Sequence, residues 1–342
     1  MRKHRLALIG LGMAVTPHAK GLLDLHKRVD VVGAFSPSQA RRTSFAARFP
    51  FPIADSLEAV LEDRSVEIVA ILTPPNTHLE LVRRAAAAGK HILLEKPLEI
   101  STERAIALVE YCRDAGVRLG VMLQHRFRPS SMRLREMIRA GELGAIAGCS
   151  TSIRLWRPQS YYDEPGRGSK ARDGGGVLIT QGIHTLDLML SLAGPIVEVR
   201  GYGATTSVHR METEDMVCAA VKFANGALGV IDATTAAYPG FPERIEIVAE
   251  KATAIIAGTE LKVFHHDGRV TEMQADASSG GTGADPMAFP HDYHRSAIAD
   301  FLDTVENNRE PTVSGTEALN VHRLIDALLQ AAATGQSVSP NA

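Results

Sequence analysis

The sequence predicts a two-domain α/β protein, in which an N-terminal doubly wound parallel sheet precedes an α+β domain with a large open, mostly antiparallel sheet. At 342 residues the chain is longer than one hydrophobic core usually serves. Over residues 1–122, short apolar runs alternate with helical segments, which is typical of a parallel sheet covered on both faces. Beyond that stretch, hairpin signals replace the alternation. We therefore expect one domain at 1–122 and a second at 123–342.

The first domain is expected to contain five strands with helices between them. The strands are predicted at 5–9, 29–35, 66–72, 91–94 and 117–122. The helices are predicted at about 14–26, 38–48, 56–62, 77–88 and 102–115. The last helix is the best marked, because Ser101 can cap its start, Glu103 lies in its first turn and Gly116 follows its end.

After residue 122, where the second domain is expected to begin, the regular alternation of strand and helix patterns ends. Asn225-Gly226 and Asp267-Gly268 each separate two apolar runs, and such dipeptides favour tight hairpin turns. An antiparallel meander is therefore predicted. Residues 275–290, rich in Gly, Ser and Pro, are predicted to form a mobile loop, and 340–342 a frayed tail. Helices of this domain are predicted at about 130–140, 177–192, 294–307 and 316–333.

The composition favours a small-molecule partner. Apolar residues make up 45% of the chain and charged residues 22%, with a net charge of −2, so we expect no binding to nucleic acid or anionic membranes. Three scattered cysteines indicate a reducing compartment, which we take to be the cytoplasm. The basic start followed by a short apolar run also resembles a signal peptide, but that run carries the glycines discussed next. No run of about 18 apolar residues predicts a membrane span.

The end of the first strand carries Gly10-Leu11-Gly12, followed by Met13 and Ala14 at the start of a helix. Glycines allow a dinucleotide pyrophosphate to approach the main chain, and the helix N-terminus offers free N–H groups. Val15 takes the place of the usual third glycine. The pattern predicts a nicotinamide dinucleotide site, with a purely structural turn as the alternative.

The end of the second strand favours NADP over NAD. An NAD site usually places a carboxylate there, against the ribose 2′-hydroxyl, but this chain has Ser36 and Ser38, followed by Arg41. Hydroxyls and a guanidinium suit a 2′-phosphate. In the alternative interpretation the arginine only faces solvent.

The third strand runs into Thr73-Pro74-Pro75-Asn76-Thr77-His78, at the edge of the sheet where ligands bind in open α/β folds. Thr73, Pro74 and Asn76 are therefore candidates for contact with the cofactor. Asn76 or Thr77 can instead cap the following helix. His78 is expected near the cofactor as a helix residue and not as a catalyst.

Glu95-Lys96-Pro97 follows the fourth strand. A lysine ammonium at this position can stabilise the alkoxide that forms when a hydride leaves an alcohol carbon. Glu95 can hold the nicotinamide ribose or orient the lysine. An exposed Glu-Lys pair before a turn is the alternative.

A second candidate segment runs from Gly174 to Asp187. If residues 178–192 are helical, Thr180, His184 and Asp187 lie on one face, and the histidine is a candidate general acid and base. A helix histidine can also serve only for packing.

Candidate substrate contacts come from aromatic and guanidinium side chains, which suit a sugar ring. Packing and a dimer contact are the alternatives for the tyrosines. No metal site is predicted, because the histidines near the C-terminal end lack a third partner at suitable spacing. The substrate candidates are Arg126, Trp156, Arg157, Tyr161 and Tyr162.

Together, the glycine entry, Thr73 to His78, Glu95-Lys96-Pro97 and the segment ending at Asp187 resemble the glucose-fructose oxidoreductase, inositol dehydrogenase and MocA-like family. The resemblance covers nearly the whole chain. It implies a Rossmann domain, a C-terminal domain whose open sheet forms the subunit interface of a homodimer or homotetramer, and an active site between the domains. It also implies NAD or NADP as the cofactor, with sugars, polyols or related compounds as substrates.

The resemblance implies Lys96 and His184 as the catalytic pair, with Glu95 on the cofactor, and the Ser36-x-Ser38-x-x-Arg41 pattern looks like that of NADP-using members. Many members place an aspartate four residues before the catalytic histidine, where this chain has Thr180. Either Asp187 compensates or the histidine titrates differently. The predicted function is hydride transfer between nicotinamide and a carbinol or carbonyl carbon. The alternatives are a cofactor-binding regulator, or an enzyme that retains its cofactor and recycles it between two sugars.

Overall fold

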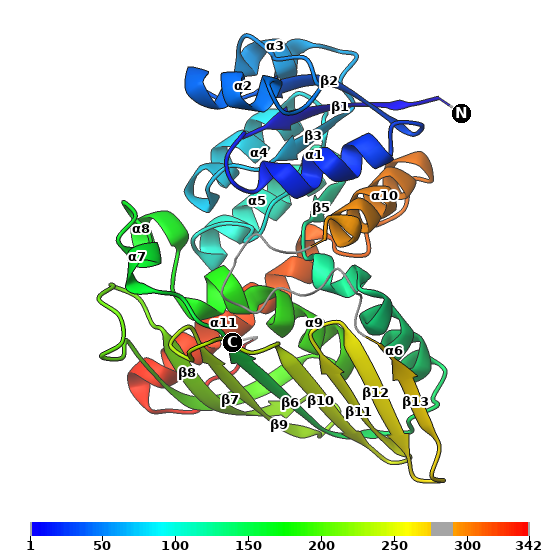
Figure 1. Ribbon diagram of the computed structural model, residues 1–342, viewed down its shortest axis with the longest axis vertical. Coiled ribbons are helices and arrows are strands. Elements are labelled where there is room, and N and C mark those ends of the chain that lie inside the picture. Colours follow the sequence, from blue (N-terminus) through cyan, green and yellow to red (C-terminus); the bar gives the residue numbers. More distant parts are fainter. Residues whose placement is uncertain (1, 275–289, 341–342) are drawn as a thin grey trace. The chain divides into compact units, whose positions relative to one another are not determined.

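A computed structural model describes residues 2–274 and 290–340 (Figure 1). The chain divides into two units, one formed by residues up to 124 together with 291–319, and the other by 125–290 together with residues from 320 onward. The sequence-based division at residue 122 placed 291–319 in the second domain, whereas these residues join the first unit. The predicted loop at 275–290 lies, except for residue 290, outside the described residues, as do residues 341 and 342 of the predicted tail.

The first unit contains the predicted parallel sheet. Its strand order is β2-β1-β3-β4-β5, and every neighbouring pair in it is parallel. The order reverses between β1 and β3, so the carboxyl ends of these two strands flank the crevice where open α/β sheets take ligands. The strands are β1 (His4–Ile9), β2 (Val29–Phe35), β3 (Ile68–Ile71), β4 (His91–Leu94) and β5 (Leu119–Val121).

Helices of the first unit follow the predicted order. Serine side chains cap three of them, and Ser101 accepts the N–H of Arg104 as the sequence predicts. A short 3-10 turn, η1 (Pro75–Thr77), precedes one helix. The helices are α1 (Val15–Asp24), α2 (Gln39–Ala46), α3 (Leu57–Glu62), α4 (His78–Ala87), α5 (Thr102–Asp114) and α10 (Asp292–Glu306).

Helix α10 belongs to the first unit because it packs on α1. A Cβ atom placed on Gly21 of α1 would lie 3.2 Å from the Cα of Arg295, so the two helix backbones approach closely at this glycine. The apolar face of α10 is buried through Ala297, Ile298 and Phe301. A contact between segments so far apart in sequence leaves no local signal, which explains why the sequence did not separate 291–319 from the second domain.

The second unit contains an eight-stranded sheet in the order β13-β12-β11-β10-β6-β9-β8-β7. Within the described ranges its pairs are antiparallel except for β6 with β9, which confirms the predicted mostly antiparallel sheet. Both predicted hairpins are present. The strands are β6 (Ile146–Arg154), β7 (Ile196–Ala204), β8 (Met216–Phe223), β9 (Leu228–Thr234), β10 (Arg244–Ala249), β11 (Ala252–Ala257), β12 (Glu260–His265) and β13 (Val270–Met273).

Helices α6 (Pro129–Arg139) and α9 (Ile183–Ala193) contact this large sheet. The stretch Lys170–Ala193 is long and apolar enough to cross a membrane on length and composition alone, but 72% of its most apolar window is buried inside the protein, as in a core helix. The remaining helical segments are η2 (Gln124–Phe127), α7 (Gln159–Tyr162), α8 (Lys170–Asp173), the π-helical η3 (Leu178–Gly182) and α11 (Gly315–Thr334).

Candidate active site

The turn Gly10-Leu11-Gly12, at the end of β1, has the backbone geometry that close approach of a dinucleotide requires. Gly10 has a φ of 103°, and a Cβ atom there would lie 2.8 Å from the carbonyl carbon of Leu72, beside the end of β3. At Gly12, by contrast, the nearest atom to a placed Cβ is Nη1 of Arg41, at 3.9 Å. Packing against the end of β3 therefore requires glycine at position 10, whereas the space beside Gly12 is open up to Arg41.

The N-terminus of α1 completes this entry. Its N-cap residue, Ala14, makes no side-chain hydrogen bond to the helix, whereas Ser38, Ser56 and Ser101 cap their helices. An uncapped helix start after a glycine turn fits a pyrophosphate, whose oxygens can accept the main-chain N–H groups. Met13 is exposed beside it.

The end of β2 carries the residues predicted to select the cofactor. The Ser36 hydroxyl is buried and accepts the N–H of Ser38, and Ser38 in turn caps α2 by accepting the N–H of Arg41. Arg42 is used locally, because it donates to the main-chain oxygen of Ser36. The Arg41 side chain instead reaches toward Gly12 and makes no ion pair with any described residue.

His78 has a structural role at the end of β3. Its buried ring bridges two loops, with Nε2 2.8 Å from the Thr73 oxygen and Nδ1 3.0 Å from the Pro97 oxygen. Burial lowers the pKa of this imidazole. Neither Pro74 nor Asn76 is buried, and the Thr77 hydroxyl donates to the Pro74 oxygen instead of capping α4. The histidine thus links the loop that begins at Thr73, after β3, to the turn Glu95-Lys96-Pro97 after β4, which we call the Lys96 turn.

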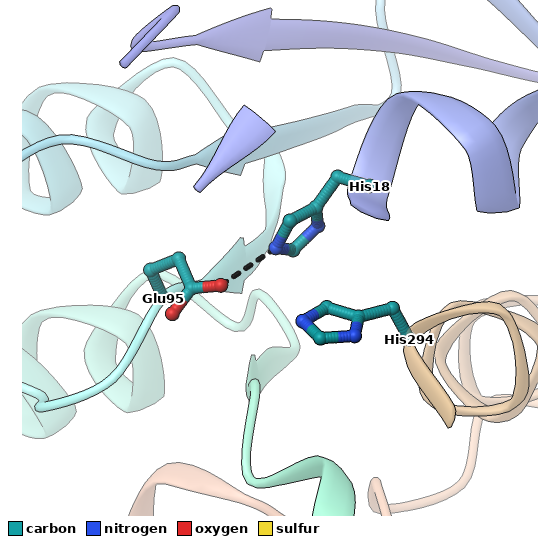
Figure 2. A group of neighbouring side chains, drawn as sticks. All are labelled: His18, Glu95 and His294. Atoms are coloured by element: carbon teal, nitrogen blue, oxygen red, sulfur yellow. Dashed lines mark hydrogen bonds and ion pairs between the residues drawn. The ribbon is translucent and has the colours of Figure 1, made fainter. Parts of the chain in front are cut away.

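Glu95, at the end of β4, is held by groups that sequence reasoning missed. The Nε2 atom of His18, on α1, lies 2.7 Å from Glu95 Oε1, and the main-chain N–H of Lys96 donates to Oε2 at 3.0 Å. His294, on α10, faces the same carboxylate (Figure 2). No sequence pattern connects three residues this far apart.

The charges of this cluster follow from its surroundings. Burial works to raise the pKa of Glu95, but the hydrogen bond from His18 and nearby positive charge outweigh it and lower the pKa to about 2. Burial lowers the pKa of His294 to about 3. The cluster therefore holds an ionised carboxylate beside a neutral His294 imidazole at neutral pH.

In the second unit, the segment that carries His184 does not start as an α-helix. Residues Leu178–Gly182 form a π-helical turn, and α9 begins only at Ile183. The predicted i, i+4 relation of Thr180 to His184 on one α-helical face is therefore altered by a wider turn. The Thr180 hydroxyl donates to the main-chain oxygen of Gly176. Its Oγ atom is thus tied back into the turn.

Glu214, which the sequence did not single out, fixes the start of this turn. Its carboxylate accepts the N–H groups of Gly176 and Leu178, and its main-chain oxygen accepts the N–H of Val177. Burial raises the pKa of this carboxyl. A Cβ atom on Gly176 would meet the Glu214 oxygen at 1.8 Å, so only glycine fits there. Three of the helix-entry N–H groups are satisfied in this way.

His184 lies beside a buried ion pair. Both oxygens of Asp187 accept from Arg126, at 2.7 Å from Nε and 2.6 Å from Nη2. The ring of His125 stacks on that of His184, with centroids 4.8 Å apart. Asp187, a predicted catalytic residue, and Arg126, a predicted substrate contact, therefore form an ion pair with one another. His125 was not predicted.

The aromatic candidates gather around another missed histidine. His209 is buried, with Nδ1 2.8 Å from Asp215 and Nε2 2.8 Å from the main-chain oxygen of Arg157. The Trp156 and Tyr162 rings both contact it. The Tyr162 hydroxyl donates to Thr235, and burial raises the pKa of this tyrosine to about 12.

Exposure separates these candidates into two groups. Tyr162 and Arg157 are buried, whereas Trp156 and Tyr161 are partly exposed. Tyr161 lies under the guanidinium of Arg167, 4.7 Å from its ring centroid. Trp156 and Tyr161 are therefore the members of this cluster that can present a ring to a ligand.

A surface cavity of about 510 Å³ lies at the other edge of the parallel sheet. Its lining comes from the first residues of β1 and β2, the end of α1 and the segment around Phe51. None of the predicted site residues lines it.

Both the first unit and the second match known proteins. Residues 4–123 match the model of an oxidoreductase family with an NAD-binding Rossmann fold, and residues 131–255 match the GFO/IDH/MocA C-terminal domain. The chain is therefore an NAD(P)-binding oxidoreductase, of the class that acts on CH–OH groups. It belongs to the Gfo/Idh/MocA family, which confirms the predicted resemblance.

Curated relatives span nearly the full chain. D-xylose 1-dehydrogenase (NADP(+)) 2 of Haloferax volcanii is 29% identical over 311 residues, which cover 89% of this chain and 90% of the relative. The scyllo-inositol 2-dehydrogenase (NAD(+)) of Bacillus subtilis is 29% identical over 325 residues, covering 92% and 90%. Among solved structures, the WlbA dehydrogenase of Bordetella pertussis, in complex with NADH and UDP-GlcNAcA, is 28% identical with a TM-score of 0.84 and 99% coverage of both chains.

Proposed function

We propose that this protein transfers a hydride between NADP(H) and a carbinol or carbonyl carbon of a sugar, a polyol or a related compound. The observation that carries the proposal is that the Gly10 entry and the Lys96 turn follow β1 and β4 at the same carboxyl edge of one parallel sheet. The names of the xylose and inositol dehydrogenases support the substrate class.

In the proposed reaction, Lys96 and His184 act on the same substrate oxygen. The bound nicotinamide supplies the hydride acceptor in oxidation and the hydride donor in reduction. During oxidation His184 takes the hydroxyl proton as the carbon–hydrogen bond breaks and the carbonyl forms, while the Lys96 ammonium stabilises the developing negative oxygen. Because Nδ1 of His184 is buried, we assign the proton exchange to Nε2.

Asp187 and Thr180 support His184 without exchanging the substrate proton. Arg126 balances the charge of Asp187, and we propose that this ion pair fixes the position of α9 and thereby of His184, which lies on the same helix. The Thr180 hydroxyl is tied to Gly176, and we propose that it holds the π-helical turn. Substrate contacts are assigned to Trp156 and Tyr161, which are exposed enough to meet a sugar ring.

The experiment that tests this function follows the absorbance of NADPH during incubation of the protein with NADP⁺ and a panel of sugars and polyols. Substrate-dependent reduction supports the proposal. Binding of NADP⁺ without turnover of any panel member would instead favour a regulatory protein. If reduced cofactor stays on the protein through extensive dialysis and is reoxidised by a second sugar, the enzyme recycles a bound cofactor.

NADP preference is assigned to Arg41, with Ser36 and Ser38 shaping the pocket. The guanidinium lies near Gly12 and forms no ion pair with a carboxylate of residues 2–274 or 290–340, so it can pair with a 2′-phosphate. We expect Arg41→Ala to weaken NADPH binding by about tenfold to a hundredfold, as expected for a lost charged hydrogen bond, with little effect on NADH. Fluorescence titration measures both affinities.

Arg42 provides the matched control for this substitution. It is the next residue along α2, but its guanidinium is engaged with Ser36 and Gln39. Arg42→Ala is therefore expected to leave the ratio of the two affinities within about threefold of the original. The assignment is refuted if the Arg41→Ala variant keeps a preference for NADPH over NADH, or if the original protein binds both cofactors equally well.

Self-association through the large sheet is also proposed. Leu228, Gly148, Val248, Thr253 and Phe264 pair in register across five strands, so their side chains form one row on one face. Leu228, Val248 and Phe264 expose 64%, 45% and 43% of their surface. A second copy of the chain would remove this apolar row from water in a homodimer or homotetramer.

The absence of any disulfide among the three cysteines accords with a cytoplasmic location.

A further inference from the structure

The cluster of His18, Glu95 and His294 joins three elements of the first unit. His18 lies on α1, whose N-terminus is proposed to take the pyrophosphate, and Glu95 precedes Lys96 at the end of β4. His294 lies on α10, and its ring meets that of His18 edge to face with centroids 5.1 Å apart. All three residues are buried, and Figure 2 shows the two rings and the carboxylate turned toward one another. The cluster therefore connects the pyrophosphate helix to the turn that carries the proposed catalytic amine.

Two imidazoles and one carboxylate are also a common zinc ligand set, so the distances have to decide. Ligands 2.0–2.1 Å from a tetrahedral ion lie about 3.4 Å from one another. Here Nε2 of His18 lies only 2.7 Å from Glu95 Oε1, which is a hydrogen-bond distance and shorter than the spacing of two ligands around a tetrahedral ion. The arrangement fits a hydrogen-bonded carboxylate and not a metal site.

We infer that His18 and His294 are positioning residues, which hold the Glu95 carboxylate ionised and fixed so that Lys96 is presented to the substrate as an oriented ammonium. This inference rests on the proposed function of Lys96. His18 donates to one carboxylate oxygen, and the other accepts the main-chain N–H of Lys96, so both oxygens are restrained. His294 fills the remaining side against α1.

Electrostatics connects this cluster to the amine. The ionised Glu95 and the Lys96 ammonium attract one another, and among the described residues the titratable groups that act on the carboxylate are His18, His294 and Lys96. Removing the donor of His18 leaves a buried carboxylate with less compensation, which then takes up a proton. Lys96 would lose its negative neighbour as a result.

The test replaces His18 with two residues that differ in one property. His18→Phe keeps the volume of the ring but removes the donor, whereas His18→Gln keeps an N–H group that can reach Glu95. His26→Phe is the control, because His26 is exposed just beyond the end of α1 and outside the cluster. Thermal unfolding confirms that each variant folds.

The first readout does not need a substrate. Lysines are reductively methylated with a ¹³C label, and the Lys96 signal is identified by its loss in Lys96→Met. We expect His18→Phe to move the titration of this signal to lower pH, and His18→Gln and His26→Phe to leave it near the original. An unchanged Lys96 signal in a folded His18→Phe protein would overturn the inference, whatever the protein does with sugars.

The second readout separates positioning from cofactor binding. We expect His18→Phe to lower kcat by about tenfold to a hundredfold at saturating substrate, since a misplaced catalytic group costs this much, while NADPH affinity changes by less than about threefold. His18→Gln should recover most of the loss. Zinc bound at one ion per chain, and released by Glu95→Gln, would overturn the inference in favour of a metal site. A wild-type protein without turnover would refute the proposed function alone, because the lysine signal still tests the positioning.

Discussion

Asp187 illustrates how a single residue's partner changes its chemical role. A carboxylate near a catalytic histidine is a candidate to stabilise the imidazolium, but here the Arg126 guanidinium occupies both of its oxygens in a buried pair. Removing either partner alone would leave an uncompensated buried charge, which is strongly destabilising. The His125 ring, stacked on that of His184, also contributes to the surroundings of the proposed acid and base.

At the same scale, His294 should make the protein sensitive to mild acid. Burial lowers its pKa in the folded protein to about 3, from an ordinary value of 6.5. The unfolded chain therefore binds a proton that the folded protein excludes, and stability falls as pH drops below about 6.5. We expect the loss on going from about pH 6.5 to pH 5 to be about 2 kcal/mol smaller in His294→Phe. Urea unfolding at both pH values measures it.

The neighbouring carboxylate of Glu95 contributes little to the change in stability between about pH 6.5 and pH 5. Glu95 has a lowered pKa of about 2 in the folded protein, against an ordinary 4.5, so its contribution to stability is lost only below about pH 4.5. His78 has the same sign as His294 and remains in the variant, so some sensitivity persists. His26→Phe should retain the full acid sensitivity, and an equally steep loss in His294→Phe would contradict the burial of a neutral imidazole.

Sequence reasoning at this scale found side chains that follow strands, and missed side chains that meet only in the folded chain. Gly10, Lys96 and His184 carried local signals, because each sits in a short motif beside a strand or helix. His18 and His294 are 276 positions apart in the sequence, and an isolated buried histidine in a helix has no signature. Their meeting depends on the packing of α10 on α1.

At the scale of the element, the glycine turn before α1 makes a prediction that separates folding from binding. Gly10→Ala forces a Cβ into the backbone after β3 at a positive φ, so we expect it to lower the free energy of unfolding by about 1–3 kcal/mol and to weaken NADPH binding. Urea unfolding and fluorescence titration measure the two effects.

Gly12→Ala is the matched partner of that substitution. A Cβ at Gly12 has open space up to Arg41, so the unfolding free energy should stay within about 0.5 kcal/mol. NADPH affinity should still fall, because the methyl group stands where the pyrophosphate approaches the main chain. If Gly12→Ala bound NADPH as tightly as the original protein, the cofactor would not lie against this turn.

Elements with strong local patterns were predicted well, and those defined by tertiary contacts were not. The five parallel strands and the cap at Ser101 follow from apolar runs and an N-terminal serine. The π-helical turn at Leu178–Gly182 could not be predicted, because it depends on Glu214, a residue distant in sequence that takes up the N–H groups of Gly176 and Leu178.

At the scale of the whole molecule, the exposed row on the large sheet predicts self-association. Leu228 and Val248 lie in one register line with Gly148 between them. Introducing lysine at both positions places charges in a contact between copies, where desolvation and repulsion oppose association. We expect Leu228→Lys/Val248→Lys to yield a smaller assembly by light scattering after gel filtration, with an unchanged fold by circular dichroism.

A control for this pair is available on the same sheet. Val270, at the end of the row on the edge strand β13, is also exposed. Because a single charge at an edge strand is easily solvated, Val270→Lys should disturb assembly less than the central pair. A wild-type protein that is monomeric at micromolar concentration would remove the sheet as a subunit interface.

The overall architecture was accessible from the sequence because both sheets repeat simple patterns over many residues. The assignment of 291–319 to the first unit was not accessible, since this segment is separated from the rest of that unit by residues 125–290 of the second. The substrate itself also lies beyond such patterns, because Trp156 and Tyr161 belong to short helical and loop segments whose side chains are placed by His209 and Arg167.

The account depends most directly on Lys96 and His184 acting together in hydride transfer. Single-turnover rates of NADP⁺ reduction, measured in Lys96→Met and His184→Ala with the substrate found by the panel, test this claim. We predict that each substitution slows hydride transfer by about two to four orders of magnitude while NADPH affinity is largely kept. Hydride transfer at the original rate in both variants would contradict the account.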